Sequence, residues 1–136
     1  MTLTDTGPLV ALINRNDPNH LVCIEAAKHL PRGPLMTTWP CFTEAMYLLH
    51  KTGGYSAQAA LWRLRDAGRL ALHDLGEDEV ARIAALMAKY HDLPMDMADA
   101  SLIAAAEWFG TRTVFALDQD FRVYRFADGS AVEVIP

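Results

Sequence analysis

The chain has 136 residues, of which 51% are hydrophobic and 21% are charged, and its formal net charge is −5. This length and apolar content predict one folded domain over residues 1–136 with a buried core, and they exclude a disordered chain. The negative charge excludes an overall basic field for nucleic acid, so binding a polyanion would require local arginine clusters or bound cations.

Strand and helix patterns alternate along the chain. In order, we predict a strand over Met1–Asp5, a helix opened by Pro8, a helix over His20–Leu30, a strand over Leu35–Thr38, helices over Pro40–Lys51 and Tyr55–Ala67, a strand over Arg69–His73, helices over Glu77–Tyr90 and Met97–Phe109, and strands over Arg112–Leu117 and Ala131–Ile135. Proline suits the first turn of a helix, and the pair Gly53-Gly54 suits a helix end. The alternation predicts an α/β/α sandwich with a central, mostly parallel sheet.

Four acidic residues, Asp5, Glu44, Asp99 and Asp118, lie where predicted strands or helices begin or end. Parallel sheets bind ligands beyond the carboxyl ends of their strands, and Asp5 and Asp118 follow two such ends. Carboxylates meeting in one pocket would be costly, because burial penalises the charged form and each close pair repels by roughly 4 kcal/mol at an effective dielectric of about 20. Convergence would therefore need compensation by protons or cations. The economical explanation is a divalent metal site, and oxygen ligands alone favour Mg²⁺ or Mn²⁺.

Each acid also has a simpler interpretation. Asp5 could cap the turn that follows it, and Glu44 could be a solvated residue favoured by a helix N-terminus. Asp96 and Asp99 have the spacing of a capping box with Asp96 as the N-cap, although Asp99 runs directly into an apolar helix. Asp120 could be only a turn residue.

Four segments of the chain match motifs of a known family. They are Leu3–Val10 (LTDTGPLV), Thr43–Ala45 (TEA), Asp96–Ala104 (DMADASLIA) and Leu117–Phe121 (LDQDF), with Arg122–Arg125 (RVYR) after the last. On these segments the whole chain resembles the PIN-domain nucleases, and most closely the toxin ribonucleases called VapC. The third segment is the most specific of the four. The resemblance implies a PIN-like fold and hydrolysis of RNA phosphodiesters.

The resemblance also implies roles for the acids. The catalytic, metal-ligating residues would be Asp5, Glu44, Asp99 and Asp118, with Asp96 as an accessory acid. Many relatives carry Thr or Ser two residues before the fourth acid, where this chain has Ala116, so a hydroxyl that could orient metal or water is missing. The expected activity is that of an endoribonuclease dependent on Mg²⁺, or on Mn²⁺, with no covalent enzyme intermediate.

Positive side chains should guide the RNA backbone toward these acids. Candidate RNA contacts are Arg15, Lys51, Arg122 and Arg125, because they flank the acidic segments in sequence. The simpler interpretation of each is a solvated or ion-paired residue.

The resemblance implies two protein partners. VapC toxins are held inactive by an antitoxin whose tail can place basic and apolar side chains at the acidic crevice. The family usually dimerises, and the predicted helices Pro40–Lys51 and Tyr55–Ala67 offer apolar faces for a homodimer. The alternatives are a PIN nuclease that is not a toxin, and a catalytically silent module that binds RNA or protein.

Other chemistries fit the sequence less well. Phosphoryl transfer through an aspartyl phosphate in one family needs a second acid two residues after Asp5, where this chain has Gly7. The P-loop motif is missing, and the histidines show no spacing typical of a zinc site.

Two features predict a cytoplasmic protein. The first residues carry no Lys or Arg and the apolar stretch Leu9–Ile13 is far shorter than a membrane span, so we expect neither a targeting segment nor a membrane association. Cys23 and Cys41 lack metal-ligand spacing, and we expect both to be reduced, half-buried packing residues.

Overall fold

A central sheet of five strands organises the protein, whose computed structural model describes residues 1–136. The strands are β1 (Thr2–Thr4), β2 (Leu35–Thr38), β3 (Leu70–His73), β4 (Thr113–Phe115) and β5 (Glu133–Ile135). They lie in the order β3-β2-β1-β4-β5, and every neighbouring pair is parallel. The predicted parallel sheet is confirmed, and its first strand in sequence lies at the centre.

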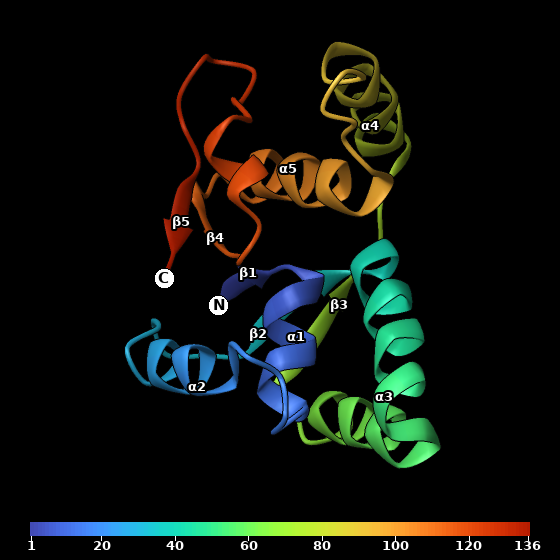
Figure 1. Ribbon diagram of the computed structural model, residues 1–136. Coiled ribbons are helices and arrows are strands. Elements are labelled where there is room, and N and C mark those ends of the chain that lie inside the picture. The colour runs from blue at the N-terminus through green and yellow to red at the C-terminus, as the bar shows by residue number, and fades with distance from the viewer.

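Helices cover both faces of this sheet. They are α1 (Thr6–Ile13), α2 (His20–Lys28), α3 (Trp39–Asp66), α4 (Glu77–Lys89) and α5 (Met97–Phe109). Helices α4 and α5 lie on one side of the sheet, and α1, α2 and α3 lie on the other (Figure 1). The three layers form the expected α/β/α sandwich, because parallel strands need long crossover connections that place helices on the sheet faces.

Helix α3 combines two helices that the sequence predicts separately. The chain leaves helical geometry at Gly54, where φ is 63° and ψ is −157°, and then resumes the helix. A positive φ of this kind is strained for residues with a Cβ atom, so glycine is needed at the bend. The predicted break at Gly53-Gly54 therefore lies at the observed bend.

The largest core cluster surrounds α5. Every residue of this helix from Ala98 to Ala106 is buried, and Leu3 of β1 and Val114 of β4 pack in the same cluster. Five of these nine residues are alanines. Their small side chains let the helix lie close to the sheet, and this close packing holds the acidic start of α5 near the strand ends.

Two details differ from the predictions. A short 3-10 helix, η1, spans Gln119–Arg122 where no helix was expected. Cys23 and Cys41 are free thiols as predicted, but both are fully buried and not half-buried. No helix combines the length and the apolar character that crossing a membrane requires.

Candidate active site

The acidic segments converge where β1 and β4 end side by side. The backbone N–H of Asp5 donates to the carbonyl oxygen of Phe115 at 2.8 Å, so the residues that follow the two strands share one edge of the sheet. Helices α3 and α5 begin near the same edge. Together they form a cavity of about 370 Å³, here called the acidic pocket, lined by Asp5, Thr6, Gly7, Glu44, Leu48, Asp96, Asp99, Leu117 and Asp118. All five acids singled out from the sequence line it, and no Lys or Arg does.

Asp5 is 5% exposed and occupies the N-cap position of α1, yet its side chain makes no capping hydrogen bond. The simple interpretation of Asp5 as a turn cap therefore does not hold. Its carboxylate accepts a long contact of 3.7 Å from the Cys41 thiol. Burial raises the pKa of Asp5 to about 7, repulsion from Glu44, Asp96 and Asp118 adds to this rise, and the backbone N–H of Thr6 opposes it.

Asp99 is 7% exposed and projects from the first turn of α5. Asp96 is the N-cap of this helix, and its carboxylate accepts from the Asp99 backbone N–H at 2.8 Å, as the capping spacing predicted. The Tyr124 hydroxyl donates to Asp99 Oδ2 at 2.7 Å. Burial raises the pKa of Asp99 to about 8, the Tyr124 hydrogen bond lowers it, and repulsion from the neighbouring acids raises it further.

Glu44 is half-buried in the second turn of α3, so it is not a fully solvated residue. The Thr6 hydroxyl donates to Glu44 Oε2 at 3.1 Å. The same hydroxyl lies 3.3 Å from the Cys41 carbonyl oxygen. Because Thr6 belongs to α1, this contact fixes the Glu44 carboxylate relative to the end of β1.

Asp118 and Asp120 lie at the start of η1. Asp118 is the N-cap, and its carboxylate accepts from the Asp120 backbone N–H at 2.9 Å. One carboxylate oxygen from each of Asp99, Asp118 and Asp120 lies within 4.8 Å of the other two, a spacing that could hold a metal ion. Asp120 is thus both the turn residue expected from the sequence and a member of this acidic cluster.

A buried polar layer supports the pocket and was not predicted. Thr38 Oγ1 and Ser101 Oγ are 2.6 Å apart, and the Ser101 hydroxyl donates to the Ala98 carbonyl oxygen at 2.7 Å. The Cys41 thiol donates to the same carbonyl oxygen at 3.4 Å. These contacts connect β2, α3 and α5 directly beneath Asp5 and Asp99. Small hydroxyl residues inside an apolar segment were the only sequence signal for this layer.

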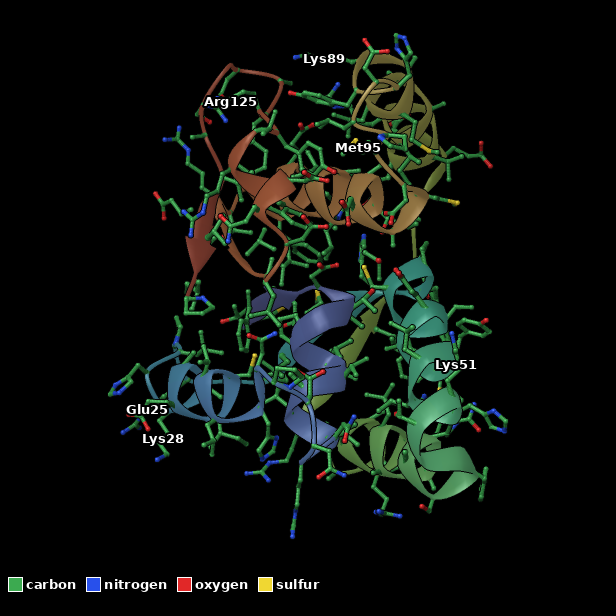
Figure 2. The ribbon with its side chains drawn as sticks, in the orientation of Figure 1. Glu25, Lys28, Lys51, Lys89, Met95 and Arg125 are labelled. Carbon is green, nitrogen blue, oxygen red and sulfur yellow. The ribbon has the colours of Figure 1, made fainter.

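None of the four predicted RNA contacts lines the acidic pocket. Arg122 donates to Gln119 Oε1 at 2.9 Å, and Arg125 Nη1 donates to the backbone carbonyl oxygens of Arg122, Val123 and Tyr124. The Lys51 ammonium lies 5.4 Å from the centre of the Tyr47 ring. Figure 2 shows Lys51 on α3 and Arg125 beyond η1, on opposite sides of the molecule.

Arg15 lies at the other edge of the sheet. It follows α1, which carries the chain away from Asp5, and it lines a separate cavity of about 860 Å³ at the amino ends of β2 and β3. We call this cavity the apolar groove; its lining includes Leu12, Ile13, Arg15, Ile24, Leu35, Leu64 and Arg69. Arg15 is therefore close to the first acidic segment in sequence but does not lie near the acidic pocket in the folded protein.

The parallel sheet with its strand order, and the acids gathered at its carboxyl edge, agree with the nuclease class that the sequence motifs indicated. The family model of the PIN domain matches residues 2–127, so the chain belongs to the PIN domain family, as its motifs indicated. It is 28% identical to the Ribonuclease VapC26 of Mycobacterium tuberculosis over 98% of this chain and 99% of that protein.

Solved structures share the fold. The crystal structure of the toxin VapC20 of Mycobacterium tuberculosis, which cleaves the sarcin-ricin loop, matches with a TM-score of 0.83 and 21% identity over 100% of both chains. A toxin–antitoxin complex from Klebsiella pneumoniae matches with a TM-score of 0.65 and 20% identity over 89% of this chain and 90% of that one. The expected PIN-like α/β fold is confirmed.

Proposed function

We propose that this protein is a metal-dependent endoribonuclease of the VapC type and the toxin of a toxin–antitoxin pair. The observation that carries the proposal is that acids from α3, α5 and the ends of β1 and β4 line one pocket without a basic residue. The catalytic and metal-holding residues are Asp5, Glu44, Asp99 and Asp118, with Asp96 as an accessory acid. Family membership and the ribonuclease relative support the same activity.

The donor set fits a hard divalent cation. The pocket offers carboxylate oxygens and the hydroxyl of Thr6, with no histidine in its lining. Burial raises the pKa of the nearby Cys41 thiol far above its ordinary value, so this sulfur stays protonated and is a poor metal ligand. Oxygen donors alone favour Mg²⁺, or Mn²⁺, over zinc. When bound, such a cation would supply Lewis-acid activation of water and of the scissile phosphate.

The acids of the pocket have different tasks in this proposal. Asp5 and Asp99 are the most buried, so they stay ionised near neutral pH only beside a cation, and we assign the cation to them. Asp118 is fixed by its own N-cap hydrogen bond and completes the set. Glu44, with one oxygen held by Thr6, has a second oxygen that can accept a hydrogen bond from the attacking water.

RNA and protein partners would approach this edge of the sheet. We propose Lys51, Arg122 and Arg125 as contacts for the RNA backbone, whereas Arg15 would meet RNA only if the strand extended to the opposite edge. An antitoxin would present basic side chains to the acidic pocket, in keeping with the toxin–antitoxin complex that shares the fold. Tyr47 and Tyr55, which are 64% and 74% exposed on α3, support a homodimer through that helix.

We further propose that residues 1–136 form one nuclease domain. The central strand β1 comes from the start of the chain, and β4 and β5 come from its last third. Removing either part would leave the sheet without one side of the acidic pocket.

The nuclease proposal is tested by RNA cleavage with purified protein and Mg²⁺. Wild-type protein should cleave, excess EDTA should stop cleavage, and Asp99→Asn should reduce it to background. The matched control is Asp92→Asn, which changes a carboxylate that is 93% exposed and lies outside the pocket. Cleavage that persists in EDTA, or full activity of Asp99→Asn, would contradict the proposal, and an inactive wild type would favour the catalytically silent alternative.

The toxin assignment needs a separate experiment. Expression of the wild-type chain in a bacterial host should arrest growth, and Asp5→Asn expressed to the same level should not. Co-expression of the protein encoded by the adjacent gene should restore growth if that protein is the antitoxin. Active nuclease that causes no growth arrest would support a PIN nuclease that is not a toxin.

A further inference from the structure

Tyr124 is a fully buried tyrosine that does not line the acidic pocket itself but contacts Asp99, which does. Its hydroxyl donates to Asp99 Oδ2 at 2.7 Å. With Asp99 ionised beside a cation, as proposed above, this contact is a charge-assisted hydrogen bond, which is shorter and stronger than a bond between neutral groups.

The ring of Tyr124 is held rigidly by two aromatic neighbours. Its centroid lies 5.2 Å from that of Tyr90 and 5.3 Å from that of Phe121, with interplanar angles of 65° and 82°. Edge-to-face packing of this kind is favourable and leaves the ring little freedom. The Tyr124 hydroxyl is therefore fixed in space before any ligand arrives.

The segment that carries Tyr124 also carries two other acids of the cluster. The Tyr124 backbone N–H donates to the Asp120 carbonyl oxygen at 3.2 Å, which joins it to η1. Asp118 and Asp120 start η1, whereas Asp99 belongs to α5. The hydrogen bond from Tyr124 to Asp99 is thus a direct side-chain connection between the two segments that supply these carboxylates.

We infer that Tyr124 is a positioning residue for the metal site. By occupying Oδ2 of Asp99, it fixes the carboxylate plane and leaves Oδ1, which accepts no hydrogen bond in the structure, free to face the cation. It also keeps Asp99 in register with Asp118 and Asp120. Hydrogen bonds to metal-ligating carboxylates typically change metal affinity by about 10-fold to 100-fold. The inference rests on the proposed metal-dependent function.

The test compares binding of Mn²⁺ alone, measured by electron paramagnetic resonance, in the wild-type chain and in Tyr124→Phe. Phenylalanine preserves the aromatic packing and removes only the hydroxyl. We expect Mn²⁺ to bind about 10-fold more weakly to Tyr124→Phe, and RNA cleavage to recover largely when Mn²⁺ is raised to saturation. The matched control is Tyr90→Phe, which removes a hydroxyl that accepts from the Arg125 backbone N–H and leaves the same ring contact with Tyr124.

A double-mutant cycle separates positioning from general structural damage. If Tyr124 acts through Asp99, Tyr124→Phe should not change the residual Mn²⁺ affinity of Asp99→Asn. Unchanged Mn²⁺ affinity in Tyr124→Phe, or an equal loss in Tyr90→Phe, would overturn the inference while leaving the nuclease proposal intact. A wild-type chain that binds no Mn²⁺ would overturn the proposed metal site itself.

Discussion

The acidic pocket and the apolar groove lie at opposite edges of one sheet and differ in size and chemistry. The acidic pocket, about 370 Å³, is at the carboxyl edge and is lined by five acids and no basic residue. The apolar groove, about 860 Å³, is at the amino edge and is lined by aliphatic side chains with Arg15 and Arg69, and no acid. The larger of these two cavities is therefore mainly apolar, whereas the smaller one contains the clustered carboxylates.

The comparison shows that cavity size does not locate the chemistry. In the acidic pocket, burial raises the pKa of Asp5 to about 7 and that of Asp99 to about 8, and repulsion from the neighbouring carboxylates adds to both shifts. Strongly raised pKa values concentrate at functional sites, because burial and like charges are arranged there to suit the chemistry.

The largest expected effect comes from neutralising an acid in the smaller cavity. Asp5→Asn should lower RNA cleavage by about 1,000-fold or more, because removing a ligand of a catalytic metal removes most of the transition-state stabilisation that the metal provides. The measurement is the initial rate of cleavage at saturating Mg²⁺. The fold should remain intact, as urea unfolding can check, because the change relieves repulsion in the pocket. A decrease of less than about 10-fold would show that Asp5 does not take part in the chemistry.

The second effect concerns stability without metal. Asp5 and Asp99 each have an ordinary pKa of 3.8, and in the folded protein these values are raised to about 7 for Asp5 and about 8 for Asp99. Between these limits the folded state binds more protons than the unfolded state, so the free energy of unfolding should fall as pH rises, and level off above about pH 8. Each unit of pKa shift corresponds to about 1.4 kcal/mol.

Urea unfolding in EDTA at about pH 5.5 and about pH 8 measures this difference. Stability should decrease by about 2 kcal/mol or more in the wild type, and clearly less in Asp99→Asn. Mg²⁺ added at the higher pH should restore part of the loss, since a ligand of the folded state stabilises it. Equal pH dependence in the two proteins would show that Asp99 carries no raised pKa.

A smaller effect is expected at the Thr6 hydroxyl, which holds Glu44. Thr6→Val keeps the shape of the side chain and removes the donor to Glu44 Oε2. Losing one hydrogen bond to a charged group corresponds to about 1.5 kcal/mol, so cleavage at saturating Mg²⁺ should fall by about 10-fold. Thr43→Val is the control, because Thr43 donates only to the Trp39 carbonyl oxygen on the exposed side of α3. Equal cleavage rates for the two variants would mean that the hydrogen bond from Thr6 to Glu44 does not contribute to activity.

The smallest effect is expected in the apolar groove. Arg15→Ala should leave the rate of cleavage of a short RNA within about 2-fold of the wild type, because an exposed charge at the other edge of the sheet is screened from the acidic pocket by solvent and salt. The comparison uses the same RNA and the same Mg²⁺ concentration. A strong loss of activity in this variant would show that RNA reaches both edges, and the functional separation of the two cavities would be wrong.

The sequence predicted the elements because their signals are local. Pro8 marks the start of α1, Gly54 marks the bend of α3, and Asp96 caps α5 through the Asp99 backbone N–H. Convergence of the acids was also predictable, because the carboxyl ends of adjacent parallel strands meet at one edge.

Other parts of the site depend on contacts that no local pattern encodes. Tyr124 meets Asp99 across 25 positions of sequence, and Thr38 meets Ser101 across 63. Arg15 is close to Asp5 in sequence, but α1 carries it to the opposite edge of the sheet. The four-residue helix η1 is too short for a hydrophobic period to reveal it.

The most direct test of the account is to locate Mn²⁺ in crystals by its anomalous scattering. The account predicts a strong peak in the acidic pocket, at about 2.2 Å from carboxylate oxygens that include one of Asp99, and loss of that peak in Asp99→Asn. An empty acidic pocket in crystals of a protein that still cleaves RNA with Mn²⁺, or a peak only at the opposite edge of the sheet, would contradict it.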